Sequence, residues 1–500
     1  QLPLARRIGA VRQGAVVADS YHIVTLGCSK NHVDSEGIAR VLGEQGLSAA
    51  ERPEDARVLV VNTCGFLAAS RRESVGAIND LLGRRRPGQL VVAAGCMAAL
   101  GDHRAEIPAG VDAVVPTQEW AQIGRVVGDL LGYEALEPPA ALDPAEMLHS
   151  FNRRHAGPSA YVKVADGCDH GCHFCVIPLI KGRQVSKRPS EVVREIRELV
   201  ETGTREVVLV AQDTIRYGAD LGIKHGLPSL LHMIAEEVPT LPWLRLLYIY
   251  PSPLTLRLVD AMAELPMVVP YLDMPIQHAD PAVLRAMGRP SSVDMTRRLV
   301  DHARSTLPDV TMRTTLIVGY PGETDAQFQT LYDFVAEMAF DHVGVFTYSY
   351  EANTRSALLA DPVPSEVAQE RRAAIMELQQ GISLRKNQAL VGATLDVLVE
   401  AIGEVEDEAG GVEPLAVGRA RRHAPEVDGM VFIPGALPVG ELVPVTVTAA
   451  TPYDLWAAPV GASADPRRSR HARGSRPRAA SRPERPAGRL SAARATRAGT

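Results

Sequence analysis

Three cysteines fall within eight residues of this chain, at Cys168, Cys172 and Cys175. Three thiolates can hold three irons of a four-iron four-sulfur (4Fe-4S) cluster, and the fourth iron then stays open to a small molecule. S-adenosylmethionine (SAM) can chelate that iron through its amino and carboxylate groups. An electron from the cluster then cleaves SAM to a deoxyadenosyl radical. The spacing therefore predicts a site for radical chemistry.

Structural zinc is the competing interpretation of these thiols, with His170 or His173 as the fourth ligand. Common zinc knuckles pair one C-x₂-C with a second pair farther along the chain, and the sequence has no second pair. A redox disulfide would leave one of the three thiols unpaired. An iron–sulfur cluster is therefore the favoured interpretation.

The remaining cysteines, Cys28, Cys64 and Cys96, each stand at the end of a short β-branched run. The runs cover 21–26, 57–62 and 90–94, and helical patterns lie near 34–46, 70–83 and 118–131. This alternation predicts a βαβαβ unit with a small open parallel sheet. Ligands of open α/β sheets bind at the carboxyl ends of the strands, so we expect the three thiols to meet at one edge. The plain alternative is three buried structural thiols.

A second alternating region begins after a link rich in Pro and Ala. Its strand candidates are 160–165, 206–212, 244–249, 268–274, 310–318 and 342–348, and its helical patterns cover 189–202, 227–237, 255–264, 292–306, 324–338 and 364–390. Six βα repeats predict a partial parallel barrel whose chemistry lies on the strand-end loops. Short β runs broken by Gly and Pro over 392–449 predict a small all-β barrel.

The predicted fold class is therefore α/β, with an open parallel-sheet domain, a partial (βα)₆ barrel and a small all-β barrel in that order. The predicted parts are an extension over 1–20, the sheet domain over 21–135, a linker over 136–157, the partial barrel over 158–388, the all-β barrel over 389–452 and an Arg-rich, disordered tail over 453–500.

The composition, with 46% apolar and 22% charged residues, is typical of a globular protein. No apolar run approaches the ~20 residues of a membrane helix, so we expect a cytoplasmic protein without a membrane partner. The net charge of −6 is uneven, because residues 461–500 hold eleven Arg and only two acids. Residues 392–449 hold ten acids against three Arg. An acidic barrel would repel phosphate and attract a basic protein.

In its order of parts, the chain resembles the radical-SAM methylthiotransferases across roughly residues 21–452. These enzymes have three separated cysteines in an N-terminal domain, a C-x₃-C-x₂-C barrel and a C-terminal TRAM module. By this resemblance Cys168, Cys172 and Cys175 hold the cluster that cleaves SAM, while Cys28, Cys64 and Cys96 hold a second, auxiliary 4Fe-4S cluster. The open iron of the auxiliary cluster would present the sulfur that is inserted into the substrate. The resemblance thus implies two 4Fe-4S clusters and SAM as cofactors.

Further SAM contacts are expected at the strand ends. Gln212 and Asp213 end the second barrel strand, where polar side chains can bind SAM or the substrate, and Gln277-His278 follows the fourth. The stretch 315–324 resembles the SAM-contacting segment of the family.

Within that stretch we assign Gly319, Gly322 and Glu323 to cofactor binding, since glycines let a ligand approach the backbone closely. Thr324 with Gln327 also predicts a capping box for the next helix. Lys181 stands where the family has Arg, which weakens the case for a role of that side chain.

Two branches of the family differ in substrate. Several stretches resemble the branch that modifies an aspartate of ribosomal protein S-twelve: 271–279 with Gln277-His278-Ala279, 345–351 with Glu351, and 424–429 with Asp428. The resemblance implies hydrogen removal from the aspartate β-carbon, sulfur insertion and methylation by a further SAM, giving 3-methylthioaspartate.

A low-potential electron donor and a sulfur donor would be further partners, and the Arg-rich tail could contact ribosomal RNA. The alternative function is methylthiolation of a tRNA adenosine. A more remote one is a non-catalytic iron–sulfur or zinc protein that binds nucleic acid.

Overall fold

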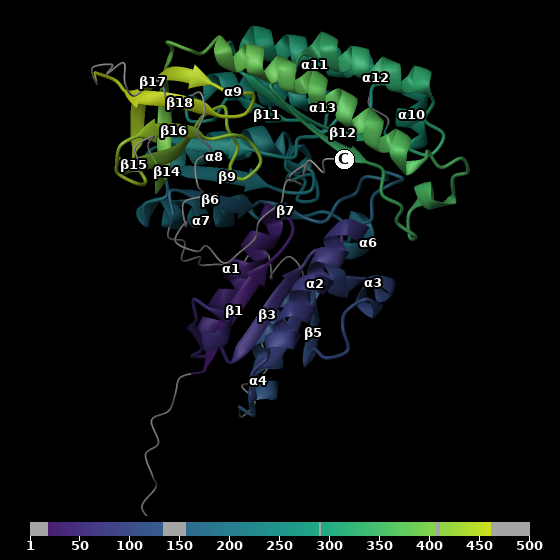
Figure 1. Ribbon diagram of the computed structural model, residues 1–500, viewed down its shortest axis with the longest axis vertical. Coiled ribbons are helices and arrows are strands. Elements are labelled where there is room, and N and C mark those ends of the chain that lie inside the picture. The colour runs from purple at the N-terminus through teal and green to yellow at the C-terminus, as the bar shows by residue number, and fades with distance from the viewer. Residues whose placement is uncertain (1–18, 134–156, 290–291, 407–410, 462–500) are drawn as a thin grey trace, which may run out of the picture.

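The computed structural model describes residues 19–133, 157–289, 292–406 and 411–461. Figure 1 shows an N-terminal sheet domain beneath a larger body that joins a partial barrel to a small β-barrel. Among the described residues, no helix has the length and apolar character needed to cross a membrane. The predicted Arg-rich tail lies almost wholly outside the described residues.

A parallel sheet of strand order β2-β1-β3-β4-β5 forms the N-terminal domain. Its strands are β1 Ser20–Thr25, β2 Ser48–Ala49, β3 Val58–Thr63, β4 Leu90–Gly95 and β5 Ala113–Pro116. Helices α1 Ser29–Glu44 and α4 Ile123–Leu131 cover one face, and α2 Ala68–Arg84 covers the other. The central strand β3 is buried along its whole length because helices lie on both faces. The three predicted strands and their parallel arrangement are confirmed, whereas the short edge strands β2 and β5 were not predicted.

Six strands form the partial barrel: β6 Ser159–Lys163, β9 Glu206–Val210, β10 Trp243–Leu246, β11 Tyr271–Asp273, β12 Thr311–Val318 and β13 His342–Thr347. All neighbours are parallel, in the orders β10-β9-β6 and β11-β12-β13, and a bridge from Leu244 to Val268 connects the two sets. The outer helices are α7 Pro189–Glu201, α8 Gly226–Glu237, α9 Pro253–Glu264, α11 Val293–Thr306, α12 Asp325–Met338 and α13 Ser365–Gln388. The strong 3.6-residue and β-branched patterns made this alternation predictable, and it is confirmed.

Short elements carry the loops at the carboxyl ends of these strands. They are the antiparallel pair β7 Ala165–Asp166 and β8 Val185–Ser186, and the helices α3 Gly101–Ala105, α6 Ile177–Lys181 and α10 Pro281–Ala286. Single 3₁₀ turns lie at Pro53–Asp55, Cys96–Ala99, Thr117–Gln122, Thr214–Arg216 and Arg355–Leu358.

The C-terminal barrel is closed, with strand order β14-β15-β16-β18-β17. Its strands are β14 Thr394–Glu406, β15 Val412–Ala420, β16 Val431–Pro434, β17 Leu442–Ala450 and β18 Leu455–Pro459. Strand β18 lies past the predicted domain end at residue 452, so that boundary is corrected here. The Ala-Ala-Pro end of β18 has weak β propensity, and the strand forms because Leu455 and Ala457 fill the barrel core.

The inner face of the partial barrel packs on this C-terminal barrel. Val208, Trp243 and Tyr271 contact Leu398 and Ala424 in a shared apolar cluster. Alternate residues of the same strands point outward to the helices, which explains why the barrel strands are apolar on both sides.

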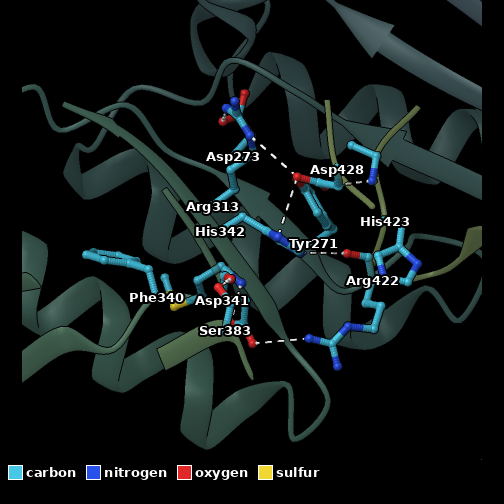
Figure 2. A network of polar contacts seen from close by, with 12 residues as sticks. Tyr271, Asp273, Arg313, Phe340, Asp341, His342, Ser383, Arg422, His423 and Asp428 are labelled. Carbon is cyan, nitrogen blue, oxygen red and sulfur yellow. Dashed lines mark hydrogen bonds and ion pairs between the residues drawn. The ribbon is translucent and has the colours of Figure 1, made fainter. Parts of the chain in front are cut away.

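A buried polar network reinforces this contact (Figure 2). Asp428 accepts a hydrogen bond from Tyr271 Oη at 2.6 Å, and its carboxylate lies 3.6 Å from His342 Nδ1 and 3.7 Å from Arg313 Nε. Burial acts to raise the pKa of Asp428, but the neighbouring His342 and Arg313 and the hydrogen bond from Tyr271 together hold it below its usual range. Asp428 therefore holds the C-terminal barrel against the partial barrel. This contact gives a structural reason for an aspartate at this position of the motif 424–429.

The same interface makes stability depend on pH through His423, which is fully buried. Burial, and next the Arg422 charge, hold its pKa well below the ordinary value. Below pH ~6.5 His423 binds a proton in the unfolded chain but not in the folded one. The free energy of unfolding therefore falls as the pH drops. Between pH 7.5 and 5.5 we expect His423 to cost about 1 kcal/mol, measured by urea unfolding. His423→Asn should remove that share of the pH dependence, whereas His225→Asn, at an exposed site, should not.

Candidate active site

The first cysteine group lies at the carboxyl ends of β1, β3 and β4. A Cβ atom on Gly27, next to Cys28, would lie 3.1 Å from Cys64 Sγ, and one on Gly65 would lie 2.8 Å from the Cys96 carbonyl. Burial raises the pKa of Cys64 to about 11 and of Cys96 to about 12, and the charges of the neighbouring cysteines add to both shifts. The sheet thus gathers the three thiols at one edge, as its topology predicts.

The second cysteine group occupies the loop between β7 and α6. Gly167 begins the loop at a φ of 79°, and a Cβ there would collide with the Arg183 carbonyl. Burial raises the pKa of Cys168 to about 11 and of Cys175 to about 12. Thiols with such pKa values stay protonated at neutral pH unless a bound metal centre replaces the proton on the sulfur.

The two loop histidines do not complete a zinc site. His170 Nε2 lies 2.6 Å from Asp213 Oδ2 and stacks on Tyr250 at 4.1 Å between ring centroids, while His173 Nδ1 bonds the Ala286 carbonyl at 2.8 Å. Across the described residues, no three His, Cys, Asp or Glu side chains stand close enough to hold a single metal ion. Because both histidine rings have other partners, the three soft thiols are the ligand set that remains, and it suits an iron–sulfur cluster with one open iron.

Near the second group lie buried polar atoms that have no hydrogen-bond partner among the described residues. They are Gln212 Oε1, Asp213 Oδ1, Tyr250 Oη and Arg289 Nε. Arg289 also stacks on Tyr250 at 4.0 Å and donates to Cys172 Sγ at 3.7 Å. Unsatisfied buried groups are costly, and a polar ligand such as the amino-acid part of SAM would satisfy them. Arg289 and Tyr250 could not be predicted as site residues from the sequence, because neither lies within a recognisable spacing.

In the stretch after β12 that contains Gly319 and Gly322, the Glu323 side chain contacts other residues of the protein. The Glu323 carboxylate is buried and accepts from the backbone N–H groups of Gly319 and Tyr320, and it pairs with His278 and Arg371. Glu323 therefore supports the loop, and the same holds for His278; a cofactor contact at either residue stays a prediction.

The two glycines of this stretch have conformational reasons to be there. Gly319 and Gly322 both have positive φ, and a Cβ on Gly319 would lie 2.5 Å from Ala368 Cβ on α13. The predicted capping box of Thr324 and Gln327 is confirmed at the start of α12. A SAM contact at either glycine stays a prediction.

The two cysteine groups meet where the sheet domain joins the barrel. Cys96 packs in one apolar cluster with Val176, which directly follows Cys175, and with Ile180 of α6. In Figure 1, α6 and β7 lie at this junction. The arrangement places both groups on one interface, although they are far apart in the sequence.

Buried charges line this junction. Asp34 and Asp166 each pair with both Lys163 and Lys181, and Lys181 Nζ also donates to Thr117 at 2.7 Å. The two carboxylates hold the pKa of Lys181 well above its ordinary value despite burial, which acts to lower it. Lys181 thus neutralises two buried carboxylates at the junction, although it differs from the Arg of the family pattern.

Glu351 bridges the two domains. Its buried carboxylate accepts from Arg71 Nη1 at 2.6 Å and from the first backbone N–H of α2, that of Ala68, at 2.9 Å. Helix α2 follows the Cys64 loop, and residues 348–356 contact the Cys172 loop through the Ser356 N–H and the His173 carbonyl, 3.0 Å apart. Glu351 therefore ties together the two loops that carry the cysteines.

Family models match three consecutive parts of the chain. An uncharacterised protein family designated UPF0004 matches residues 20–115, the radical SAM superfamily matches 162–335, and the TRAM domain matches 391–460. A solved radical SAM methyltransferase, TsrM from Kitasatospora setae, has a similar fold with a TM-score of 0.51 and 16% identity, covering 79% of this chain and 81% of its own.

Curated relatives match nearly the whole chain. Ribosomal protein uS12 methylthiotransferase RimO of Chloroflexus aurantiacus is 45% identical over 457 residues, which cover 87% of this chain and 98% of the relative. The protein of the same name from a Roseiflexus species is 44% identical, covering 90% and 99%. Identity at this level over complete relatives, together with the three matched parts in order, means that the chain belongs to the family of ribosomal protein uS12 methylthiotransferases.

Proposed function

We propose that this chain is a radical SAM enzyme that inserts a methylthio group at the β-carbon of an aspartate in ribosomal protein uS12. The relatives carry the name of that activity, and uS12 is the protein called S-twelve above. The observation that carries the proposal is the junction at which Cys96 packs against Val176, beside Cys175. A substrate side chain held there would lie between a source of radicals and a source of sulfur.

Cys168, Cys172 and Cys175 would hold one 4Fe-4S cluster, and Cys28, Cys64 and Cys96 would hold the second. When bound, the first cluster supplies the electron that cleaves SAM, and the second supplies sulfur. The side chains around the clusters would bind SAM and orient it.

Gln212 and Asp213 offer unsatisfied oxygens to the SAM amino group, and Asp213 fixes the cysteine loop through His170. Arg289 offers a donor to the SAM carboxylate. Gly319 and Gly322 would contact SAM from the loop that follows β12.

The C-terminal barrel supports a basic protein as the substrate. Asp396, Glu404 and Glu413 are exposed on it, whereas its Arg419 is fully buried against Glu206 and Glu400. A surface of this sign repels the phosphates of tRNA and attracts a basic ribosomal protein. A low-potential electron donor and a sulfur donor complete the reaction, and contact of the Arg-rich tail with ribosomal RNA is part of the proposal.

The test gives the anaerobically reconstituted full chain SAM, sulfide and a reductant, with uS12 in one reaction and an anticodon-stem tRNA in another. Mass spectrometry should find a methylthio increment on an aspartate of uS12 and none on tRNA. An increment on tRNA alone would refute the substrate and keep the chemistry. A chain that cleaves no SAM would refute the enzyme itself and favour a non-catalytic binding protein.

Glu351→Gln should uncouple the two sites, because it breaks the buried bridge that holds the Cys64 loop against the barrel. We expect more deoxyadenosine per methylthio product than in the wild type, measured by chromatography of one reaction. Unfolding in urea should show a loss of about 3 kcal/mol, since Arg71 loses its buried partner. Glu106→Gln removes the half-exposed partner of the same Arg71 and should cost less than about 1 kcal/mol. Equal coupling in both variants would contradict the role given to Glu351.

A further inference from the structure

One lysine at the junction of the cysteine groups forms no ion pair with a carboxylate of the described residues. Lys30 lies in the first turn of α1, two residues after Cys28, and is only 7% exposed. In the described part of the chain no carboxylate lies within ion-pair distance of its ammonium group, while the nearby Lys163 and Lys181 share Asp34 and Asp166. Burying an ammonium without a counter-charge is costly, so such a group calls for an anionic ligand.

The Lys30 side chain crosses from the sheet domain to the barrel. Its Nζ atom lies 3.5 Å from the Ala211 carbonyl at the end of β9, next to Gln212, and 3.4 Å from the centroid of the Tyr248 ring. The ammonium therefore points to the mouth of the barrel, where the SAM-side residues converge.

Tyr248, whose ring lies under Lys30, has a strained backbone conformation. Tyr248 has a φ of 61°, a conformation that bulky residues rarely adopt. It is held there by Asp273, which accepts from its N–H at 3.0 Å, and by the Thr214 N–H, which donates to its carbonyl at 3.0 Å. Strain of this kind concentrates at binding and catalytic sites, and the ring supports a cation on its face.

We propose that Lys30 binds the carboxylate of the aspartate side chain that is modified, and so selects an acidic side chain at the junction of the two cysteine groups. The inference rests on the proposed function, which places that side chain between the groups. A carboxylate there would form a direct ion pair with Lys30 and would lie at the N-terminal end of α1, whose first turn holds no acidic residue.

The test compares the full, reconstituted chain with its Lys30→Met variant. Methionine has a similar length and fills the same space on the Tyr248 ring without a charge, so the fold should be kept. Binding of uS12 is measured without reductant, so that no turnover occurs. The probes are uS12 itself and uS12 with the modified aspartate replaced by asparagine.

The wild type should bind the aspartate form about 10- to 100-fold more tightly than the asparagine form, the range expected for a charge-assisted hydrogen bond. Lys30→Met should bind both forms alike, and Lys30→Arg, which keeps the charge, should keep a preference. Lys224→Met, at an exposed site, is the matched control and should bind as the wild type does.

A Lys30→Met chain that keeps the full preference for aspartate would overturn the inference. So would a loss of iron from this variant alone, because Lys30 would then serve the cysteines and not the substrate. A wild type that binds uS12 but, with reductant, leaves it unmodified would instead refute the proposed function and this inference with it.

Discussion

Replacing Cys172 by alanine should lower reductive SAM cleavage at least about 100-fold, more than the 10–100-fold that outer partners of a metal site are worth. Two thiols remain in the loop, so one iron of the cluster would lose its protein ligand. Arg289 would also lose its sulfur acceptor. Deoxyadenosine formed with a strong reductant, read by chromatography, measures the effect.

The control for this variant is Cys64→Ala, which removes a buried thiol from the other cysteine group. It should cleave SAM at a rate near that of the wild type, since the loop of Cys168, Cys172 and Cys175 is untouched. If Cys172→Ala also kept cleaving SAM, the radical would have to arise elsewhere and the assignment of the loop would fall. Zinc in place of iron in the wild type would lead to the same conclusion.

Much of the architecture was predictable because its signals are local. Each β-branched run is followed by a helical period, and a parallel sheet then places the ends of its strands at one edge. The positions of Cys28, Cys64 and Cys96 follow from that rule alone. Strand β18 lies beyond the predicted barrel because it is short and rich in Ala, so that barrel closure decides its conformation.

The roles of the charged residues were not predictable, because each depends on a partner far away in the chain. Glu351 finds Arg71 across 280 residues, and Asp428 finds Tyr271 across 157. Both had been read as marks of the substrate branch, and both are buried contacts between domains. The sequence shows a charge but not its burial, so it cannot separate a residue that binds substrate from one that holds two domains together.

Lys181 and Lys30 are buried charged residues whose importance the sequence does not indicate. Neither stands in a spacing that indicates a site, yet both ammonium groups are buried at the junction of the cysteine groups. A lysine directly after a cysteine-bearing strand end is the only signal that could have pointed to Lys30. Its significance depends on the absence of a carboxylate around it among the described residues, which only the fold reveals.

Replacing Cys64 by alanine should separate the two halves of the reaction. The variant should hold roughly four irons per chain where the wild type holds roughly eight, because one of two 4Fe-4S clusters loses a ligand. It should still form deoxyadenosine but make at least about 100-fold less methylthio product on uS12. Iron analysis and mass spectrometry of the same sample measure both.

The physical reason is that Cys64 is buried between Cys28 and Cys96, where no other described side chain can supply a replacement thiolate. A radical formed on the substrate would then find no sulfur at the junction, and deoxyadenosine would accumulate without product. Ser48→Ala changes an exposed hydroxyl on the edge strand β2 of the same domain and should leave both iron and product unchanged. If Cys64→Ala kept its iron and its product, the first cysteine group would be a set of structural thiols, and the sulfur would have to reach the substrate by a route that bypasses the sheet domain.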